Sequence, residues 1–161
     1  MKNKEMVRII FGIGSNLGNR HKNIENSIEY LASSFFLENI KLSKFLKNDA
    51  MLPNNSPKSW NKEFINIAIS GDIDFHKFDA IKILTTIKEI EKKIGRKDRK
   101  RWAPREIDID ILMIGEKSII INDLLTIPHQ GLLKRDFFLK TVTEIEPELL
   151  KIYLKKTHDQ N

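Results

Sequence analysis

Residues 90–115 of the chain read IEKKIGRKDRKRWAPREIDIDILMIG, and this stretch predicts a helix, a basic loop and a strand in succession. It opens at the end of a helix, because isoleucines recur at helical spacing over residues 83–94 and Gly95 stands where a cap is expected. A basic loop follows. The stretch closes in a strand over residues 107–114, where isoleucine and aspartate alternate. Helix, loop and strand are therefore contiguous.

The same periodicities continue toward the N-terminus. A short β-branched strand is expected over residues 7–11, ending at Gly12, and an amphipathic helix over residues 24–35. A second strand begins at residues 40–42, and residues 47–62 form a long irregular loop. Residues 64–69 alternate cleanly as a third strand.

Toward the C-terminus, residues 137–139 are expected to form a strand or turn, followed by a helical tail. The resulting order, strand-helix-strand-strand-helix-strand, is the split pattern of ferredoxin-like folds. We therefore predict an α+β protein with an antiparallel sheet, helices packed on one face or both, and long loops that carry the functional site.

Composition places the chain among soluble globular proteins. Its 161 residues fit a single domain over 1–161, and 40% hydrophobic with 31% charged residues excludes wholesale disorder. The absence of cysteine excludes disulfide frameworks, zinc-thiolate sites and thiol nucleophiles. No signal peptide or membrane-spanning run is recognisable, so a cytoplasmic location is expected.

The excess positive charge is local. The chain has 28 basic and 22 acidic residues, a net charge of +6. Residues 88–105 hold nine basic and three acidic residues, so this segment accounts for the whole excess. A protein that coats nucleic acid or a membrane spreads its charge more widely. The pattern favours a small polyanion bound at one place.

The aspartates of the last strand form a candidate metal site. Alternation puts Asp108 and Asp110 on one face, about 7 Å apart at Cα. Two carboxylates on an apolar strand repel each other unless a cation lies between them, and Mg²⁺ with nucleotide phosphates suits such ligands. The alternative interpretation is a strand with one solvated face. The adjacent cations favour phosphoryl transfer.

The basic loop allows two interpretations. It carries Trp102 among arginines and lysines, and its charge suits either a phosphate-binding loop or a nucleic-acid patch with Trp102 as a stacking platform. Because a tryptophan in a polar loop is costly to expose, closure over a ligand is one role for it. Charge alone does not separate these interpretations.

Other candidate residues also have structural interpretations. The glycines of residues 12–18 have the spacing GxGxxxG, which does not match a dinucleotide fingerprint, and a tight strand-to-helix turn accounts for them. His129 and Arg135 could donate to anionic oxygens, and Phe64 with Asn66 could hold a heterocycle. A structural histidine, a core phenylalanine and an edge asparagine are the alternatives.

Taken together, the motifs GIGSNLG, EFINIAI, residues 90–115 and IPHQGLLKRDFFL resemble the 6-hydroxymethyl-7,8-dihydropterin pyrophosphokinase family over residues 9–149. The resemblance implies transfer of pyrophosphate from ATP to the pterin hydroxymethyl group, with release of AMP, in folate biosynthesis. It implies ATP as co-substrate and two Mg²⁺ ions held by Asp108 and Asp110. It implies no nucleic-acid or membrane partner.

The resemblance also assigns roles to side chains. Arg96 and Arg105, with the two aspartates, would be catalytic and would stabilise charge on the moving phosphoryl groups. The expected ATP contacts are Glu91, Trp102, His129 and Arg135. The expected pterin contacts are Phe64, Asn66, Trp102 and Phe137, with Leu52 and Pro53 as stand-ins in a loop that departs from the family pattern.

Some family members are fused to dihydropteroate synthase or dihydroneopterin aldolase, so the chain is expected to be either a whole enzyme or one domain of a fusion. The competing functions are a nucleic-acid-binding ferredoxin-like module and a palm-like nucleotidyl transferase or cyclase. The paired aspartates argue against the first and the Pro-His…Arg-x-Phe segment against the second.

Overall fold

The computed structural model describes residues 3–159. The elements follow in the order β1 (Met6–Ser15), α1 (Arg20–Ser34), β2 (Glu38–Leu42), β3 (Leu46–Asn48), a short 3-10 helix (Lys58–Trp60), β4 (Phe64–Asp74), α2 (Ala80–Ile94), β5 (Asp108–Ile114), β6 (Ile119–Ile121), β7 (Leu125–Ile127), α3 (Asp136–Ile145) and α4 (Pro147–Asp159).

The main sheet is antiparallel and has the strand order β2-β4-β1-β5, with β3 also paired to β4. The two long strands, β1 and β4, lie side by side at its centre. The predicted ferredoxin-like α+β arrangement is therefore confirmed.

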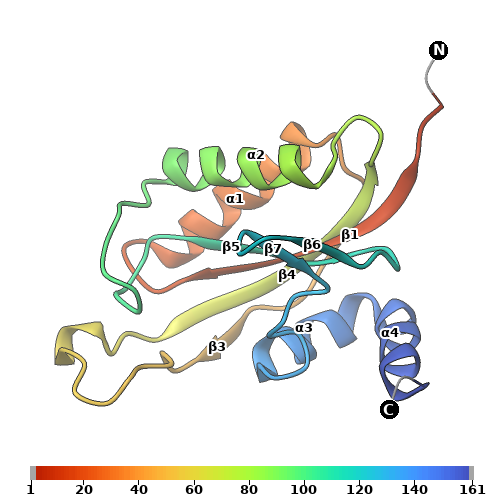
Figure 1. Cartoon of the computed structure of the whole chain (residues 1–161). Coiled ribbons are helices and arrows are strands. Elements are labelled where there is room, and N and C mark those ends of the chain that lie inside the picture. The colour runs from red at the N-terminus through yellow and green to blue at the C-terminus, as the bar shows by residue number, and fades with distance from the viewer. Residues whose placement is uncertain (1–2, 160–161) are drawn as a thin grey trace.

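Helices cover both faces of the sheet. Figure 1 shows α1 and α2 on one face and α3 and α4 on the other. On the first face the predicted stripe of α2 is buried against the sheet, with Ile83, Ile87 and Ile90 at most 2% exposed. On the second, Phe138, Val142 and Ile145 of α3 recur at helical spacing and build a smaller core. The sheet is thus the middle of three layers.

Local sequence signals set the helix ends. Asn19 and Asp79 cap α1 and α2, accepting hydrogen bonds from the backbone N–H groups of Lys22 and Lys82. Gly95 ends α2 in the left-handed conformation, with φ 117°, as predicted. The basic loop therefore leaves the helix at a fixed point.

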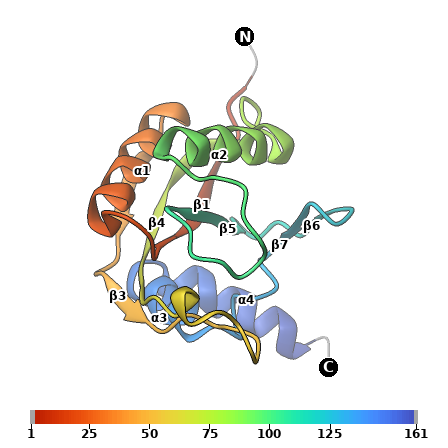
Figure 2. The same cartoon turned by 90° about the vertical axis from the view of Figure 1, so that its left-hand side faces the viewer.

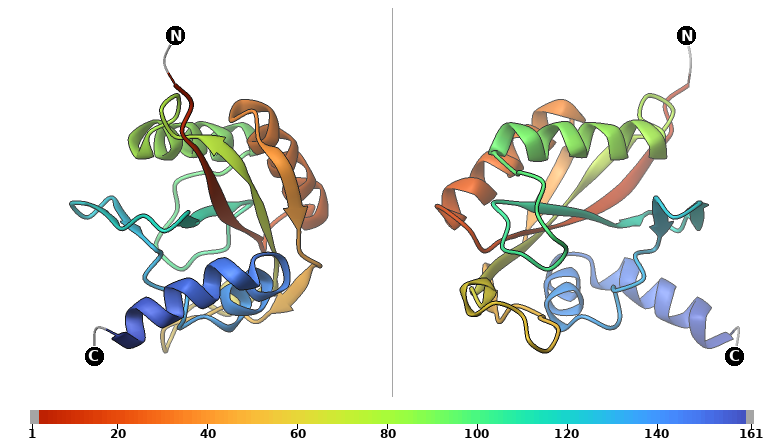
Figure 3. Two further views of the ribbon diagram at one scale, coloured as in Figure 1. Left: turned by 90° about the vertical axis from the view of Figure 1, so that its right-hand side faces the viewer. Right: turned by 60° about the vertical axis from the view of Figure 1, so that its left-hand side comes forward.

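Two long loops meet at one end of the sheet. The loop between α2 and β5 and the loop between β3 and β4 approach each other there (Figure 2). The small β6–β7 hairpin extends away from the main sheet beyond β5 (Figure 3).

Three sequence expectations are wrong. Residues 137–139 lie in helix α3 rather than a strand or turn. Strand β1 does not end at Gly12 but continues to Ser15. The segment over residues 47–62 is not wholly irregular, because it contains the end of β3 and the 3-10 helix. Within residues 3–159, no helix has the length and apolar character needed to cross a membrane.

Candidate active site

A cavity of about 280 Å³ lies where the two long loops meet the sheet. Most of the predicted site residues line it, namely Leu52, Phe64, Asn66, Trp102, Arg105, Asp108, Asp110, His129, Arg135 and Phe137. Residues from β1, β3, α3 and the two long loops complete the lining, namely Gly12, Gly14, Asn48, Ala50, Met51, Arg101 and Phe138. Three predicted residues do not line it: Pro53, Glu91 and Arg96.

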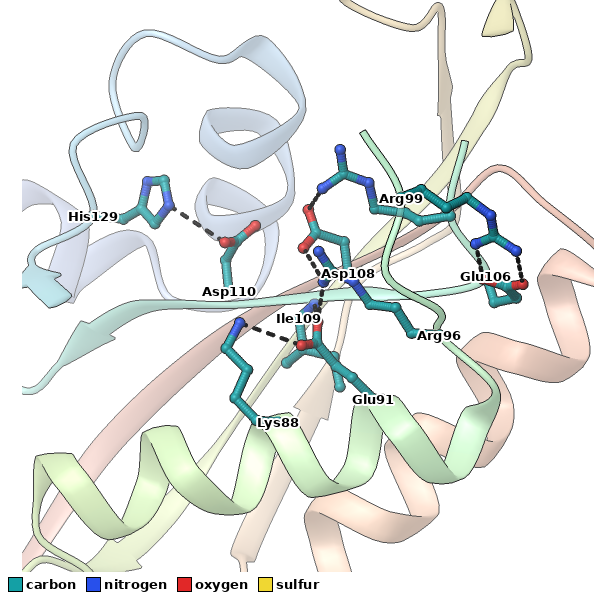
Figure 4. A network of polar contacts seen from close by, with 10 residues as sticks. Lys88, Glu91, Arg96, Arg99, Glu106, Asp108, Ile109, Asp110 and His129 are labelled. Atoms are coloured by element: carbon teal, nitrogen blue, oxygen red, sulfur yellow. Dashed lines mark hydrogen bonds and ion pairs between the residues drawn. The ribbon is translucent and has the colours of Figure 1, made fainter. Parts of the chain in front are cut away.

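The two aspartates of β5 face the cavity, as the alternation predicted, and basic groups surround them. Asp108 accepts a hydrogen bond from Nη1 of Arg96 at 3.0 Å, and Nη1 of Arg105 lies 3.4 Å from its other oxygen. Asp110 lies 3.5 Å from Nε2 of His129 (Figure 4). His129 Nδ1 accepts from the N–H of Gly131 at 2.9 Å, so the proton of the neutral ring is at Nε2, facing Asp110.

Burial and a neighbouring carboxylate raise the pKa of the first of these aspartates. Burial raises the pKa of Asp108 to about 6, and the neighbouring Asp110 carboxylate adds to the rise, whereas the guanidinium groups of Arg105 and Arg96 oppose it. A divalent cation between the two carboxylates would remove their repulsion. Residues 3–159 contain no cluster of three or more His, Cys, Asp or Glu suited to a metal. Two carboxylates alone fit Mg²⁺, which keeps waters and takes phosphate oxygens as its other ligands.

Glycines in β1 make room for the cavity. A Cβ at Gly12 would lie 2.9 Å from Cε1 of Phe138, and one at Gly14 would lie 2.7 Å from Oδ1 of Asn66. Both glycines are inside the strand, so close packing, not a turn, requires them. The predicted strand-to-helix turn accounts only for Gly18, whose φ is 75°.

Another part of the cavity lining is aromatic. Phe64 and Asn66 share one face of β4, and Nδ2 of Asn66 donates to Oδ1 of Asn48. Phe138 contacts Phe137 with ring centroids 4.7 Å apart. Trp102 is half-buried, has a φ of 74°, and stacks with the guanidinium of Arg101. These groups offer flat surfaces and an amide to a heterocycle.

Asn16 connects the loops to the end of β1, and the sequence interpretation missed this role. Its Oδ1 accepts from the backbone N–H of Arg105 at 2.9 Å, and its Nδ2 donates to the carbonyl of Lys62 at 3.2 Å. Asn16 is buried, and its N–H donates to the carbonyl of Arg105 at 3.2 Å. It therefore holds the ends of both long loops near the cavity.

A second cavity, of about 380 Å³, lies between α2 and the β6–β7 hairpin. It shares Asp110 and His129 with the first cavity. Its other walls include Leu84 and Lys88 of α2 and residues 122–126 of the hairpin. Asp110 and His129 thus stand between the two cavities, whereas Asp108 lines the first cavity alone.

Glu91 and Arg96 lie beside these cavities rather than in their walls. The Glu91 side chain is 3% exposed and lines neither one. Arg96 bridges Glu91 and Asp108, and although burial lowers its pKa, the charges of both carboxylates raise it above the usual value. Glu91 is expected to contact a nucleotide, and it lines neither of these two cavities.

Comparison with known proteins agrees with this geometry. The family model of 7,8-dihydro-6-hydroxymethylpterin-pyrophosphokinase (HPPK) matches residues 10–147. The 2-amino-4-hydroxy-6-hydroxymethyldihydropteridine pyrophosphokinase of Aquifex aeolicus is 35% identical over 155 residues, covering 94% of this chain and 88% of that protein. The folate synthesis bifunctional protein of Chlamydia muridarum is 35% identical over 140 residues, which cover 86% of this chain.

Several relatives are much longer. The chain spans 30% of the chlamydial bifunctional protein. In the crystal structure of wild-type HPPK-DHPS from Plasmodium falciparum, the match covers 99% of this chain and 47% of that one, with a TM-score of 0.63 and 14% identity. That likeness shows the shared fold. The family match and the Aquifex relative together show that the chain belongs to the 7,8-dihydro-6-hydroxymethylpterin-pyrophosphokinase family.

Proposed function

We propose that the chain transfers pyrophosphate from ATP to the hydroxymethyl oxygen of 6-hydroxymethyl-7,8-dihydropterin and releases AMP. The observation that carries this proposal is the position of Asp110 and His129, which are shared by an aromatic cavity and a second cavity beside the hairpin. The aromatic cavity suits the pterin, and the cavity beside the hairpin suits the nucleotide. The reacting groups would then meet at the aspartates.

The pterin is assigned to the first cavity. Phe64 and Phe137 offer faces for the ring, and Asn66 offers its amide oxygen, since its Nδ2 is engaged by Asn48. Ala50, Met51 and Leu52 line this end of the cavity and Pro53 does not, so we assign Leu52 of the atypical loop to the pterin site. Trp102 stands at the edge, where closure of the basic loop would exclude water.

The nucleotide is assigned to the second cavity, with its triphosphate leading past His129 to the aspartates. His129, Arg105 and Arg135 all line the first cavity, and their side-chain N–H groups are suited to phosphate oxygens. In the reaction, the hydroxymethyl oxygen forms a bond to the β-phosphorus. The bond between that phosphorus and the α,β-bridging oxygen breaks, AMP leaves, and the hydroxyl proton passes to solvent.

Two Mg²⁺ ions are proposed as cofactors, held by Asp108 and Asp110. When bound, they would neutralise triphosphate charge and orient the reacting oxygen. The chain's own residues do the remaining work of positioning and charge stabilisation, which dominates catalysis of phosphoryl transfer. Arg96 and Arg105 supply fixed positive charge at the entrance to β5.

A nucleic-acid-binding role is the competing function. It would use the same basic loop, but the carboxylates of Asp108 and Asp110 face the adjacent cavity and repel phosphates when no metal is present.

A dihydropteroate synthase is the proposed partner, either fused or separate. The support is the names of the longer relatives, which include a folate synthesis bifunctional protein and HPPK-DHPS.

The test is AMP formation from ATP and Mg²⁺, measured with and without the hydroxymethyldihydropterin. We expect AMP only when the pterin is present, in equal amount to the pterin product. Pterin-independent AMP, or no AMP at all, would overturn the proposal. RNA and single-stranded DNA are added as competitors, and we expect no inhibition by them at physiological salt.

A further inference from the structure

Glu91 is a buried carboxylate whose position the proposed reaction does not explain. It lies in the last turn of α2, with its side chain 3% exposed. A buried carboxylate is costly unless it is paired and hydrogen-bonded, so its partners define its role. Its Oε2 accepts from the N–H of Ile109 at 3.0 Å and from Nη1 of Arg96 at 2.7 Å, and its Oε1 lies 3.4 Å from Nζ of Lys88 (Figure 4).

One oxygen of Glu91 therefore connects two parts of the site. Ile109 lies between the two aspartates on β5, so the hydrogen bond to its N–H fixes the backbone that carries both carboxylates. Arg96 is the first residue after the Gly95 cap. The carbonyl of Glu91 also accepts from the Arg96 N–H at 3.0 Å, so Glu91 holds Arg96 by its main chain as well as its side chain.

Arg96 is shared between two acids. Its Nη1 donates to Glu91 and, at 3.0 Å, to Asp108. Within residues 3–159, no protein acceptor is hydrogen-bonded to its Nε or Nη2. A cation that bound Asp108 would compete with Arg96 for that carboxylate. Only Glu91 would then keep the guanidinium in place.

We propose that Glu91 is a positioning residue. It retains Arg96 at the edge of the first cavity when the carboxylate of Asp108 binds a metal ion instead of Arg96. Arg96 then keeps one donor on Glu91 and presents Nε and Nη2 to phosphate oxygens. The second function of Glu91 is to hold β5 in register beneath the aspartates. The phosphate part of this inference rests on the proposed function, whereas the hold on Arg96 and Ile109 does not.

Two substitutions separate the two tasks. Glu91→Gln retains an acceptor for the Ile109 N–H and removes the charge that competes with Asp108 for Arg96. Glu91→Met removes both the acceptor for the Ile109 N–H and the negative charge. The matched control is Glu146→Gln, because Glu146 is also largely buried and pairs with an arginine, its Oε1 lying 2.5 Å from Nε of Arg8, but it lines neither cavity.

The first readout needs no ligand. We expect the side-chain NMR signals of Arg96 to shift in Glu91→Gln, while hydrogen exchange of the Ile109 amide stays slow. In Glu91→Met we expect that exchange to accelerate by about tenfold or more. Unmoved Arg96 signals in Glu91→Gln, or unchanged exchange in Glu91→Met, would contradict the positioning role.

The second readout is the binding of α,β-methylene-ATP, measured by calorimetry with Mg²⁺ present. In this analogue the bridge between the α and β phosphorus atoms cannot be cleaved. We expect about tenfold weaker binding in Glu91→Gln and unchanged binding in Glu146→Gln. Equal affinity in Glu91→Gln and the native chain would overturn the proposal. If the native chain bound no nucleotide, the proposed function would fail, and the Arg96 and Ile109 signals would still decide the positioning role.

Discussion

Gly14 of β1 lies opposite Asn66 of β4, and a Cβ on Gly14 would come within 2.7 Å of the Asn66 amide oxygen. On its other side Gly14 is paired with Asp108 of β5. The central strand thus carries no side chain at the point where the aromatic and carboxylate parts of the cavity meet. Because Gly14 has no side chain, Asn66 can lie close to the backbone of β1.

Gly14→Ala should therefore displace Asn66 and weaken pterin binding. We expect the KM for the pterin to rise about tenfold and the KM for ATP to stay within about twofold of the native value, measured by steady-state kinetics. Gly71→Ala is the control, because its Cβ would meet Leu37 at 3.1 Å, outside the cavity. An unchanged pterin KM in Gly14→Ala would contradict the assignment of Asn66.

Asp110→Asn should lose turnover while the fold survives. The substitution keeps the size of a side chain that faces both cavities and removes the charge assigned to metal binding. We expect kcat to fall by about 10³-fold or more, with the melting temperature within about 3 °C of the native value. Retained activity in a folded variant would refute the metal role of Asp110.

Asp108→Asn should change the pH dependence of stability in metal-free protein. Burial raises the folded-state pKa of Asp108 to about 6 from an ordinary 3.8, so the native state binds more protons than the unfolded state between these values. The contribution of Asp108 to the free energy of unfolding therefore falls as pH rises from about 4 to about 6, and stays low above that.

Urea unfolding at several pH values with EDTA present measures this effect. Relative to the native chain, we expect Asp108→Asn to gain about 1–2 kcal/mol in free energy of unfolding between pH 4 and pH 8. Parallel stability curves for the two proteins across this range would show that Asp108 is not perturbed.

Trp102→Ala should weaken ligand binding more than folding. The Trp102 side chain is half-buried in a loop, lines the first cavity and has a left-handed backbone conformation, with φ 74°. We expect about tenfold weaker binding of the pterin in the presence of nucleotide, and a melting temperature lowered by less than about 2 °C. A large loss of melting temperature with unchanged binding would identify Trp102 as a core residue.

The fold could be predicted where periodicity was long and regular. The alternation in β5 and the isoleucine stripe of α2 gave correct faces, because each pattern runs over several residues and one face of each element is buried. Helix α3 was missed because three adjacent apolar residues follow its first residue, Asp136, and its helical spacing shows only when Phe138, Val142 and Ile145 are taken together. The β6–β7 strands are three residues each, too short for any period.

The site could be predicted where chemistry follows from residue type. Four of the predicted site residues, Asp108, Asp110, Arg105 and Phe64, line the same cavity. Asn16 and Asn48 were not predicted, since an asparagine in a loop has no pattern, and their roles arise from contacts across 89 and 18 positions. Glu91 is predicted to contact the nucleotide, and the sequence did not indicate that its carboxylate accepts from Ile109 and Arg96.

In the proposed reaction, the β- and γ-phosphoryl groups of ATP move together. A single-turnover reaction with ATP labelled separately at the α, β and γ phosphorus measures where each group goes. We expect the β and γ labels both to appear in the pterin product and the α label to appear in AMP. Transfer of the γ label alone, with formation of ADP, would contradict it.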